Sequence, residues 1–189
     1  MKRSQILTSC FLSLLLLIFS LTSSSQAKAG DFEVGAGIGW LADVGNGPDG
    51  HGLNVRLNAA YLYNEWVAFL LEQDFGGTFW KNSTSHFHGA TIIAARFTYP
   101  DLNGIDIWGQ IGLGGAYYAK HHNNEDWSRG FFAFRLGIGA TYKIDTNLGL
   151  GANFDYTICA GNSDDGHHFH KGSDNAHALN FQVHIAYNF

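Results

Sequence analysis

The last eleven residues of this 189-residue chain alternate strictly between two kinds of side chain. One set is apolar and consists of Leu179, Phe181, Val183, Ile185, Tyr187 and Phe189, and the other consists of Asn180, Gln182, His184, Ala186 and Asn188. A period of two places the two sets on opposite faces of a β-strand, whereas a helix repeats about every 3.6 residues. The C-terminal segment therefore predicts a strand with one apolar and one polar face.

Seven further segments alternate in the same way, which gives a prediction of eight strands. They span residues 32–40, 54–63, 66–76, 87–99, 105–117, 132–142 and 148–158. Two of these segments are less regular. The first places Gln73 in the apolar set and Leu70 in the other, and the second places Thr91 outward and Ile92 inward.

The connections between these segments alternate in length. Three are short, at Asn64-Glu65, 100–104 and 144–147, and four are longer and polar, near 42–52, 77–86, 121–129 and 161–175. Short turns at one end and long loops at the other are typical of transmembrane β-barrels. The pattern predicts an all-β fold, an eight-stranded antiparallel up-and-down transmembrane β-barrel.

A soluble barrel of the lipocalin kind is the competing interpretation. Such a barrel turns its apolar set inward and its polar set toward water. Here only 14% of residues are charged, and the polar set is dominated by Gly, Ala and Asn. Small residues suit the crowded interior of an eight-stranded barrel, which side chains fill. Aromatic residues near strand ends, such as Trp40 and Tyr142, suit the interfacial girdles of a membrane barrel.

The N-terminal segment resembles a secretory signal peptide. Lys2 and Arg3 precede an apolar run, and Ala27-Lys28-Ala29 is a small-residue cleavage site. We expect residues 1–29 to be a signal peptide and not a transmembrane anchor, and residues 30–189 to form the barrel. Cleavage would leave sixteen acidic against eight basic residues, which disfavours nucleic acid as a partner. Cys159 would stand alone, so no intrachain disulfide is expected, and its role stays open.

The phase of the strands predicts which charged residues face the lumen. Buried charges are tolerated when they are paired, so we expect a salt-bridge network inside the barrel. The predicted lumen network consists of Arg56, Glu72, Arg96, Arg135 and Asp155. Two roles stay open for it: a structural plug that fills the lumen, or the gate of a narrow pore.

The ten histidines of the chain gather near the predicted long loops, and only His184 is expected in the lumen. His86 and His88 form one His-x-His motif, and His168 and His170 form another beside His167. Imidazoles close to carboxylates such as Asp164 and Asp165 suit Zn or Cu. The candidate metal ligands are His86, His88, His167, His168 and His170. No resident cofactor is expected. A solvated cluster without function and a pH-responsive cluster are the alternatives.

The closing Phe181-x-Val183-x-Ile185-x-Tyr187-x-Phe189, together with the leader and eight strands, resembles the small outer-membrane barrels of Gram-negative bacteria. These include the OmpA transmembrane domain, OmpX and opacity-type proteins. The resemblance implies export to the outer membrane, with recognition of the Phe189 motif by the assembly machinery. It also implies contact with lipid and lipopolysaccharide, and an unknown extracellular ligand at the loops. Fold alone does not give function.

Some small barrels are lipid A-modifying enzymes, and the sequence gives little support for this alternative. Deacylases of the PagL type carry a His-x-Ser pair on the penultimate strand, where this chain reads Phe154-Asp155-Tyr156-Thr157. Ser173 lies near His170 and His177, an arrangement that could imitate a nucleophile with its base. A histidine-rich loop produces such proximity by chance. We therefore expect no catalysis, and a structural or surface-interaction role.

Overall fold

The computed structural model describes residues 30–44, 50–79, 85–99, 102–122, 125–160 and 175–189. The expected signal peptide, residues 1–29, lies outside this set. Eight strands follow one another: β1 (Phe32–Asp43), β2 (Gly50–Leu62), β3 (Val67–Phe79), β4 (Ser85–Tyr99), β5 (Ile105–His122), β6 (Glu125–Lys143), β7 (Leu148–Ala160) and β8 (Asn175–Asn188). No helix in the described part of the chain is long and apolar enough to cross a membrane.

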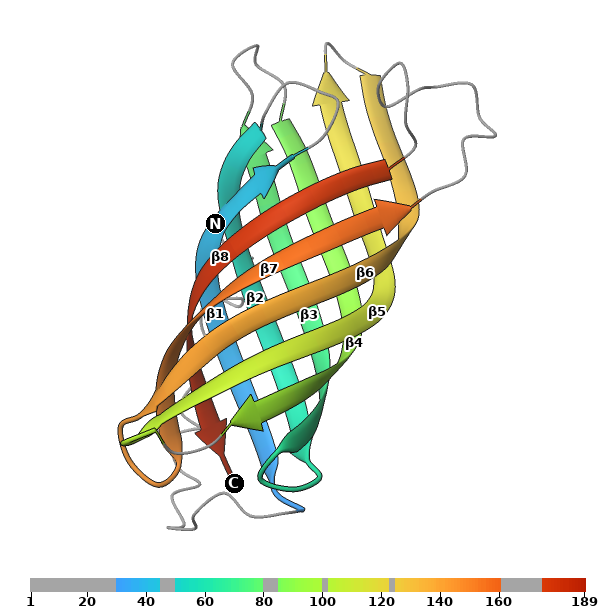
Figure 1. Cartoon of the computed structure of the whole chain (residues 1–189). Helices are drawn as coiled ribbons and strands as arrows, with labels where there is room; N and C mark the ends of the chain where they lie inside the picture. Colours follow the sequence, from blue (N-terminus) through green and yellow to red (C-terminus); the bar gives the residue numbers. More distant parts are fainter. Residues whose placement is uncertain (1–29, 45–49, 80–84, 100–101, 123–124, 161–174) are drawn as a thin grey trace, which may run out of the picture.

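The strands form one closed barrel in which each pairs with its neighbour in the chain (Figure 1). Closure comes from β1 and β8, which pair antiparallel from Glu33↔Asn188 to Asp43↔Ala178. Closure leaves no free sheet edge along the paired rows, which is how barrels avoid edge-to-edge association. The predicted eight-stranded antiparallel barrel is confirmed.

The strands β2, β4 and β6 end, and β3, β5 and β7 begin, at one end of the barrel, here called the short-turn end, and the opposite end is here called the long-loop end (Figure 1). Asn64 Oδ1 accepts hydrogen bonds from the backbone N–H groups of Trp66 and Val67, at 2.8 Å each. Asp145 Oδ1 does the same for Asn147 and Leu148, at 2.7 Å each. These Asx turns reverse the chain in very few residues.

The apolar and polar sets separate as the alternation predicts. The outward face carries exposed apolar side chains such as Ile38 on β1, Ile93 on β4 and Ile138 on β6, each at least 60% exposed. The inward face carries buried polar residues and small apolar ones. The polar set therefore lines the lumen, and the outward wall is apolar, opposite to a lipocalin-type barrel.

The two irregular strands have a simple explanation. Leu70 and Ile92 point into the lumen and join a buried apolar cluster with Tyr118 and Phe131. Thr91 and Gln73 point outward and satisfy each other, with Thr91 Oγ1 donating to Gln73 Oε1 at 2.6 Å. In each of the two strands, one apolar residue thus points inward and one polar residue points outward, and the two outward polar residues bond to each other across the β3–β4 pair.

Two of the predicted long connections are much shorter than the sequence indicates. The sequence predicts a loop over 121–129, but β5 continues to His122 and β6 begins at Glu125. The expected loop over 77–86 likewise shrinks, because β3 runs to Phe79 and β4 begins at Ser85. The polar residues at these strand ends pair with the neighbouring strand through the backbone. Their polarity is typical of loops, so the sequence gave no sign of a strand there.

Candidate functional site

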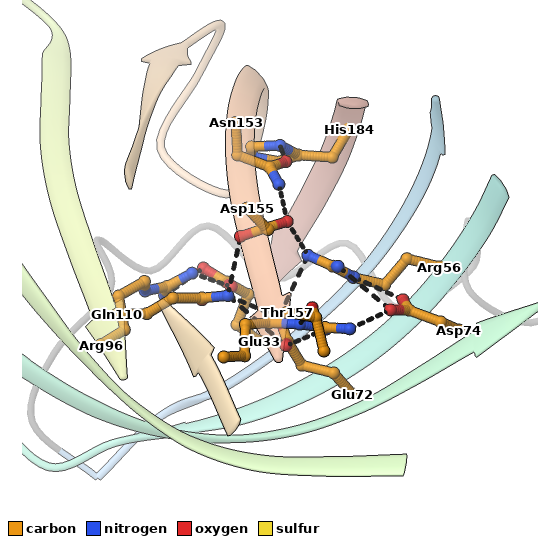
Figure 2. A network of polar contacts seen from close by, with 11 residues as sticks. Glu33, Arg56, Glu72, Asp74, Arg96, Gln110, Asn153, Asp155, Thr157 and His184 are labelled. Atoms are coloured by element: carbon orange, nitrogen blue, oxygen red, sulfur yellow. Dashed lines mark hydrogen bonds and ion pairs between the residues drawn. The ribbon is translucent and has the colours of Figure 1, made fainter. Parts of the chain in front are cut away.

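The centre of the lumen holds five charged side chains, here called the central ion network: Arg56, Glu72, Asp74, Arg135 and Asp155. Each is at most 5% exposed. Arg56 Nε lies 2.6 Å from Asp74 Oδ1, and Arg56 Nη1 lies 2.7 Å from Asp155 Oδ2 (Figure 2). One guanidinium thus connects β2 to its neighbour β3 and to β7, which lies three strands away in the other direction.

Arg135, on β6, is the second cation of the network. Its Nη1 lies 2.8 Å from Glu72 Oε2, its Nη2 contacts Asp74, and its Nε donates to Thr157 Oγ1 at 3.1 Å. All three directions of the guanidinium are therefore occupied. Because Asp74 contacts both arginines, the network is continuous from β2 to β6.

Two amides complete the network. Gln110 Nε2 lies 3.2 Å from Glu72 Oε1 and 3.3 Å from Asp155 Oδ1, and Asn153 Nδ2 donates to Asp155 Oδ2 at 2.6 Å (Figure 2). Buried ion pairs need such additional hydrogen bonds, because desolvation otherwise exceeds the Coulombic gain. These residues come from β2, β3, β5, β6 and β7, so the network reaches across the lumen.

Four of the five predicted lumen residues meet here, and Arg96 does not. Arg96 forms a separate two-pronged pair with Glu33, at 2.8 and 3.0 Å, nearer the short-turn end. Its guanidinium lies 6.0 Å from the centre of the Trp108 ring. Asp74 takes the central place instead. The phase of β3 puts Asp74 on the same face as Glu72, but phase says nothing about height along the barrel axis.

The free space inside the barrel narrows steeply toward the central ion network. A vestibule of about 670 Å³ opens at the short-turn end and is lined by residues of all eight strands. Beyond Arg96 and Trp108 lies a cavity of only about 20 Å³, bordered by Arg56 and Glu72. That volume suits about one water molecule. Space large enough for a solute therefore ends on the short-turn side of the central ion network.

The histidines are placed differently from the expectation. His88 lies in β4, points into the lumen and is 3% exposed, so it belongs neither to a loop nor to the outer surface. The expectation that His184 alone is lumenal is wrong. His184 does face the lumen, where its ring nitrogens lie 3.1 Å from Asn153 Oδ1 and 3.2 Å from Thr141 Oγ1.

The other candidate metal ligands are not brought together within the described residues. His86 lies in β4 near its beginning, while His167, His168 and His170 fall outside the described residues. Across the ranges that the structure describes, no group of three or more His, Cys, Asp or Glu side chains could hold a metal ion. His51 and His177 instead face outward, each stacked on an aromatic ring.

Comparison with known proteins shows which of them share this architecture. The family model described as outer membrane protein beta-barrel domain matches residues 11–189. A comparison with curated protein sequences finds no significant match. Among solved structures, Neisserial surface protein A is similar at 13% identity and a TM-score of 0.71, over 84% of this chain and 97% of that one.

Two further structures share the fold. Ail, the attachment invasion locus protein of Yersinia pestis, is 15% identical with a TM-score of 0.56, over 85% of this chain and 99% of that one. The N-terminal β-barrel domain of Pseudomonas aeruginosa OprF is 14% identical with a TM-score of 0.54, over 85% of this chain and 98% of that one. At these identities the likeness concerns the fold alone.

Proposed function

The chain belongs to the outer membrane protein β-barrel family, and from this premise we propose that it is a non-catalytic barrel with a structural or surface-interaction role and a closed lumen. Its localisation is the outer membrane of a Gram-negative bacterium, reached by signal-peptide export. The short-turn end faces the periplasm and the long-loop end the exterior, as in bacterial barrels of this type.

The central ion network is the observation that carries this proposal. Side chains from five strands converge on two arginines, and each of the three guanidinium nitrogens of Arg135 has a polar partner. An eight-stranded barrel has an interior only wide enough for side chains. Passage of a solute would have to break several ion pairs at once, which supports a plug rather than a pore.

The same contacts argue against catalysis on the penultimate strand. Asp155 is engaged with Arg56, and Thr157 accepts from Arg135. A nucleophile needs a base within hydrogen-bond reach, and here the hydroxyl of Thr157 faces a guanidinium. Ser173 lies outside the described residues. A missing acyl chain in the lipid A mass spectrum of expressing cells would overturn the non-catalytic assignment.

Bilayer conductance tests the closed lumen. We expect the refolded protein in planar bilayers to show no steady conductance, and the outward apolar wall to give the heat-dependent gel shift of folded barrels. A conductance that changes on Arg135→Ala would support the narrow pore instead.

Metal binding by the histidines near the long-loop end is tested by a separate experiment. Zn or Cu capture would involve His86, His167, His168 and His170, without His88, because that side chain is buried in the lumen. A saturable titration that is lost when residues 167, 168 and 170 are replaced would support a metal-binding surface. A flat titration would leave the histidines without that role.

A further inference from the structure

An amide and a hydroxyl lie together on the outward wall of the barrel, on β3 and β4. Gln73 and Thr91 are partners in the strand register, and Thr91 Oγ1 donates to Gln73 Oε1 at 2.6 Å. The residues on either side of Gln73, Glu72 and Asp74, point into the lumen and join the central ion network (Figure 2). Gln73 therefore stands directly behind that network, at the midpoint of β3 and away from both ends of the strand.

The side chains that surround this pair on the outward face are apolar. Four of them are between 45% and 69% exposed: Leu57, Leu71, Phe75 and Ile93. The hydrocarbon around such a wall offers neither hydrogen-bond donors nor acceptors. A polar group at this depth can therefore be satisfied only by protein.

The Gln73 amide has hydrogen-bonding capacity that its own chain does not use. A glutamine amide carries two N–H donors and an oxygen that accepts two hydrogen bonds. Gln73 Nε2 donates once, to the Asp74 carbonyl at 3.2 Å, and Oε1 accepts once, from Thr91. No further partner of this amide lies in the part of the chain that the structure describes. One donor and one acceptor thus remain for a group outside the chain.

A donor and an acceptor on one amide are complementary to a second copy of the same amide. Two glutamine side chains related by a two-fold axis form two N–H···O bonds, in which each side chain donates once and accepts once. Barrels of this type enter their membrane in one direction, so Gln73 lies at the same depth in every copy. A two-fold axis along the membrane normal therefore brings two of these amides face to face.

We propose that two copies of this chain associate in the membrane through the outward face of β3 and β4, with Gln73 of one copy bonded to Gln73 of the other. Association in lipid depends on packing and on hydrogen bonds between side chains, because lipid tails are as apolar as the wall. Gly115 of β5, the register partner of Thr91, is exposed and adds no side chain that would hold the second copy away. The inference rests on the membrane location of the barrel, and not on its closed lumen or its lack of catalysis.

Sedimentation equilibrium of the refolded full-length protein in density-matched micelles measures this association. We expect a reversible monomer–dimer equilibrium for the wild type. Gln73→Leu removes both hydrogen bonds across the axis, so the dissociation constant of the dimer should rise about tenfold, the combined effect of two polar contacts of average size in a membrane. Thr91→Val should leave the dimer at least as tight, because Gln73 keeps its amide.

Ile138→Ala is the matched control. Ile138 lies on β6, outside the proposed interface, and its side chain is 67% exposed on the outward face. The variant removes lipid-facing surface away from the pair, so the dissociation constant should not change. The heat-dependent gel shift checks that each variant folds. Gln73→Met, which keeps the length of the side chain without the amide, replaces Gln73→Leu if that variant fails.

Cross-linking in lipid vesicles locates the interface. Leu71→Cys places a thiol two residues from Gln73 on the same outward face. A short bismaleimide should join two such barrels across the axis. Ile138→Cys places the thiol outside the interface and should give only the background of the unsubstituted chain.

Three results would overturn the proposal: a monomer at every protein concentration, a dimer that Gln73→Leu forms as tightly as the wild type, or equal cross-linking from positions 71 and 138. The first result would leave the wall around Gln73 to lipid alone. A protein without the gel shift would instead contradict the barrel itself, and bilayer conductance tests the closed lumen separately. The free energy of unfolding, measured with the protein diluted in excess lipid, concerns the monomer and does not depend on this contact.

Discussion

Arg56 of β2 and Asp155 of β7 meet inside the barrel, with Nη1 2.7 Å from Oδ2, although 99 residues separate them in the chain. The contact links strands on both sides of the β1–β8 seam. Since closure of the barrel brings the first and last strands together, the central ion network can form only once the barrel is complete. We infer that the network stabilises the closed barrel as well as filling it.

Removal of Arg135 should therefore be costly. Arg135→Ala leaves Glu72 and Asp74 in the lumen with fewer cationic partners. Breaking a buried pair by removing one partner costs about 3–5 kcal/mol. The expected result is a loss of that size in the free energy of unfolding, measured by urea titration of the protein in lipid vesicles.

Lys143→Ala is the control for that measurement. Lys143 Nζ lies 2.9 Å from Asp106 Oδ1, but the lysine side chain is 45% exposed. Exposed pairs contribute about 0–1 kcal/mol. Equal losses in the two variants would contradict the central role of Arg135. Arg135→Lys, which keeps the charge without the fork of donors, should give an intermediate loss.

Glycines on the two faces of the barrel wall differ in the room they leave for a side chain. A Cβ added to Gly114 of β5 would lie 2.9 Å from Ile92 Cα and would overlap the backbone oxygen of Thr91, whereas Gly130 of β6, which is exposed on the outward face, has nothing within 4 Å. Gly114→Ala should cost about 1–3 kcal/mol, as overpacking does. Gly130→Ala should be neutral or slightly stabilising, because alanine restricts the unfolded chain. Thermal unfolding of both variants in the same detergent decides the matter, and equal midpoints would refute the close approach.

Alternation predicted the fold because a lipid-facing wall and a filled lumen impose opposite chemistry on successive residues. It also predicted that Arg56, Glu72, Arg135 and Asp155 share the lumen. It could not predict that Arg96 pairs with Glu33, because phase gives the face of a residue and only the register gives its height. A signal for His88 was present: Phe87 is outward and His88 inward, in phase with Ala90. The polarity of His86-Phe87-His88 concealed it.

The outward pair of Thr91 and Gln73 gives a coupled prediction. Thr91 Oγ1 donates to Gln73 Oε1 at 2.6 Å, and Gln73 Nε2 donates to the Asp74 carbonyl at 3.2 Å. Thr91→Val leaves the Gln73 oxygen without this donor on an apolar wall. Polar side-chain contacts in membranes are worth about 0.6 kcal/mol on average and up to about 1.7. We expect a loss within that range.

The double variant Thr91→Val with Gln73→Leu should recover the lost stability, because both polar groups are then gone. A double-mutant cycle of unfolding free energies in vesicles measures this coupling. Additive losses in the cycle would show that the two side chains act independently.

His88 is a buried polar side chain without a hydrogen-bond partner among the described residues. Neither ring nitrogen has a partner, and the ring lies 4.7 Å from that of Tyr118. His88→Phe keeps an aromatic ring against Tyr118 and removes two unsatisfied groups, whose desolvation costs about 1–3 kcal/mol. The variant should therefore be as stable as the wild type or more stable, in the same urea titration.

His184→Phe is the matched control, because both ring nitrogens of His184 have partners, and it should lose about 1–3 kcal/mol. If His88→Phe instead loses as much as His184→Phe, the His88 imidazole must bind a water molecule or an ion inside the lumen, and the buried apolar cluster around Tyr118 is then hydrated.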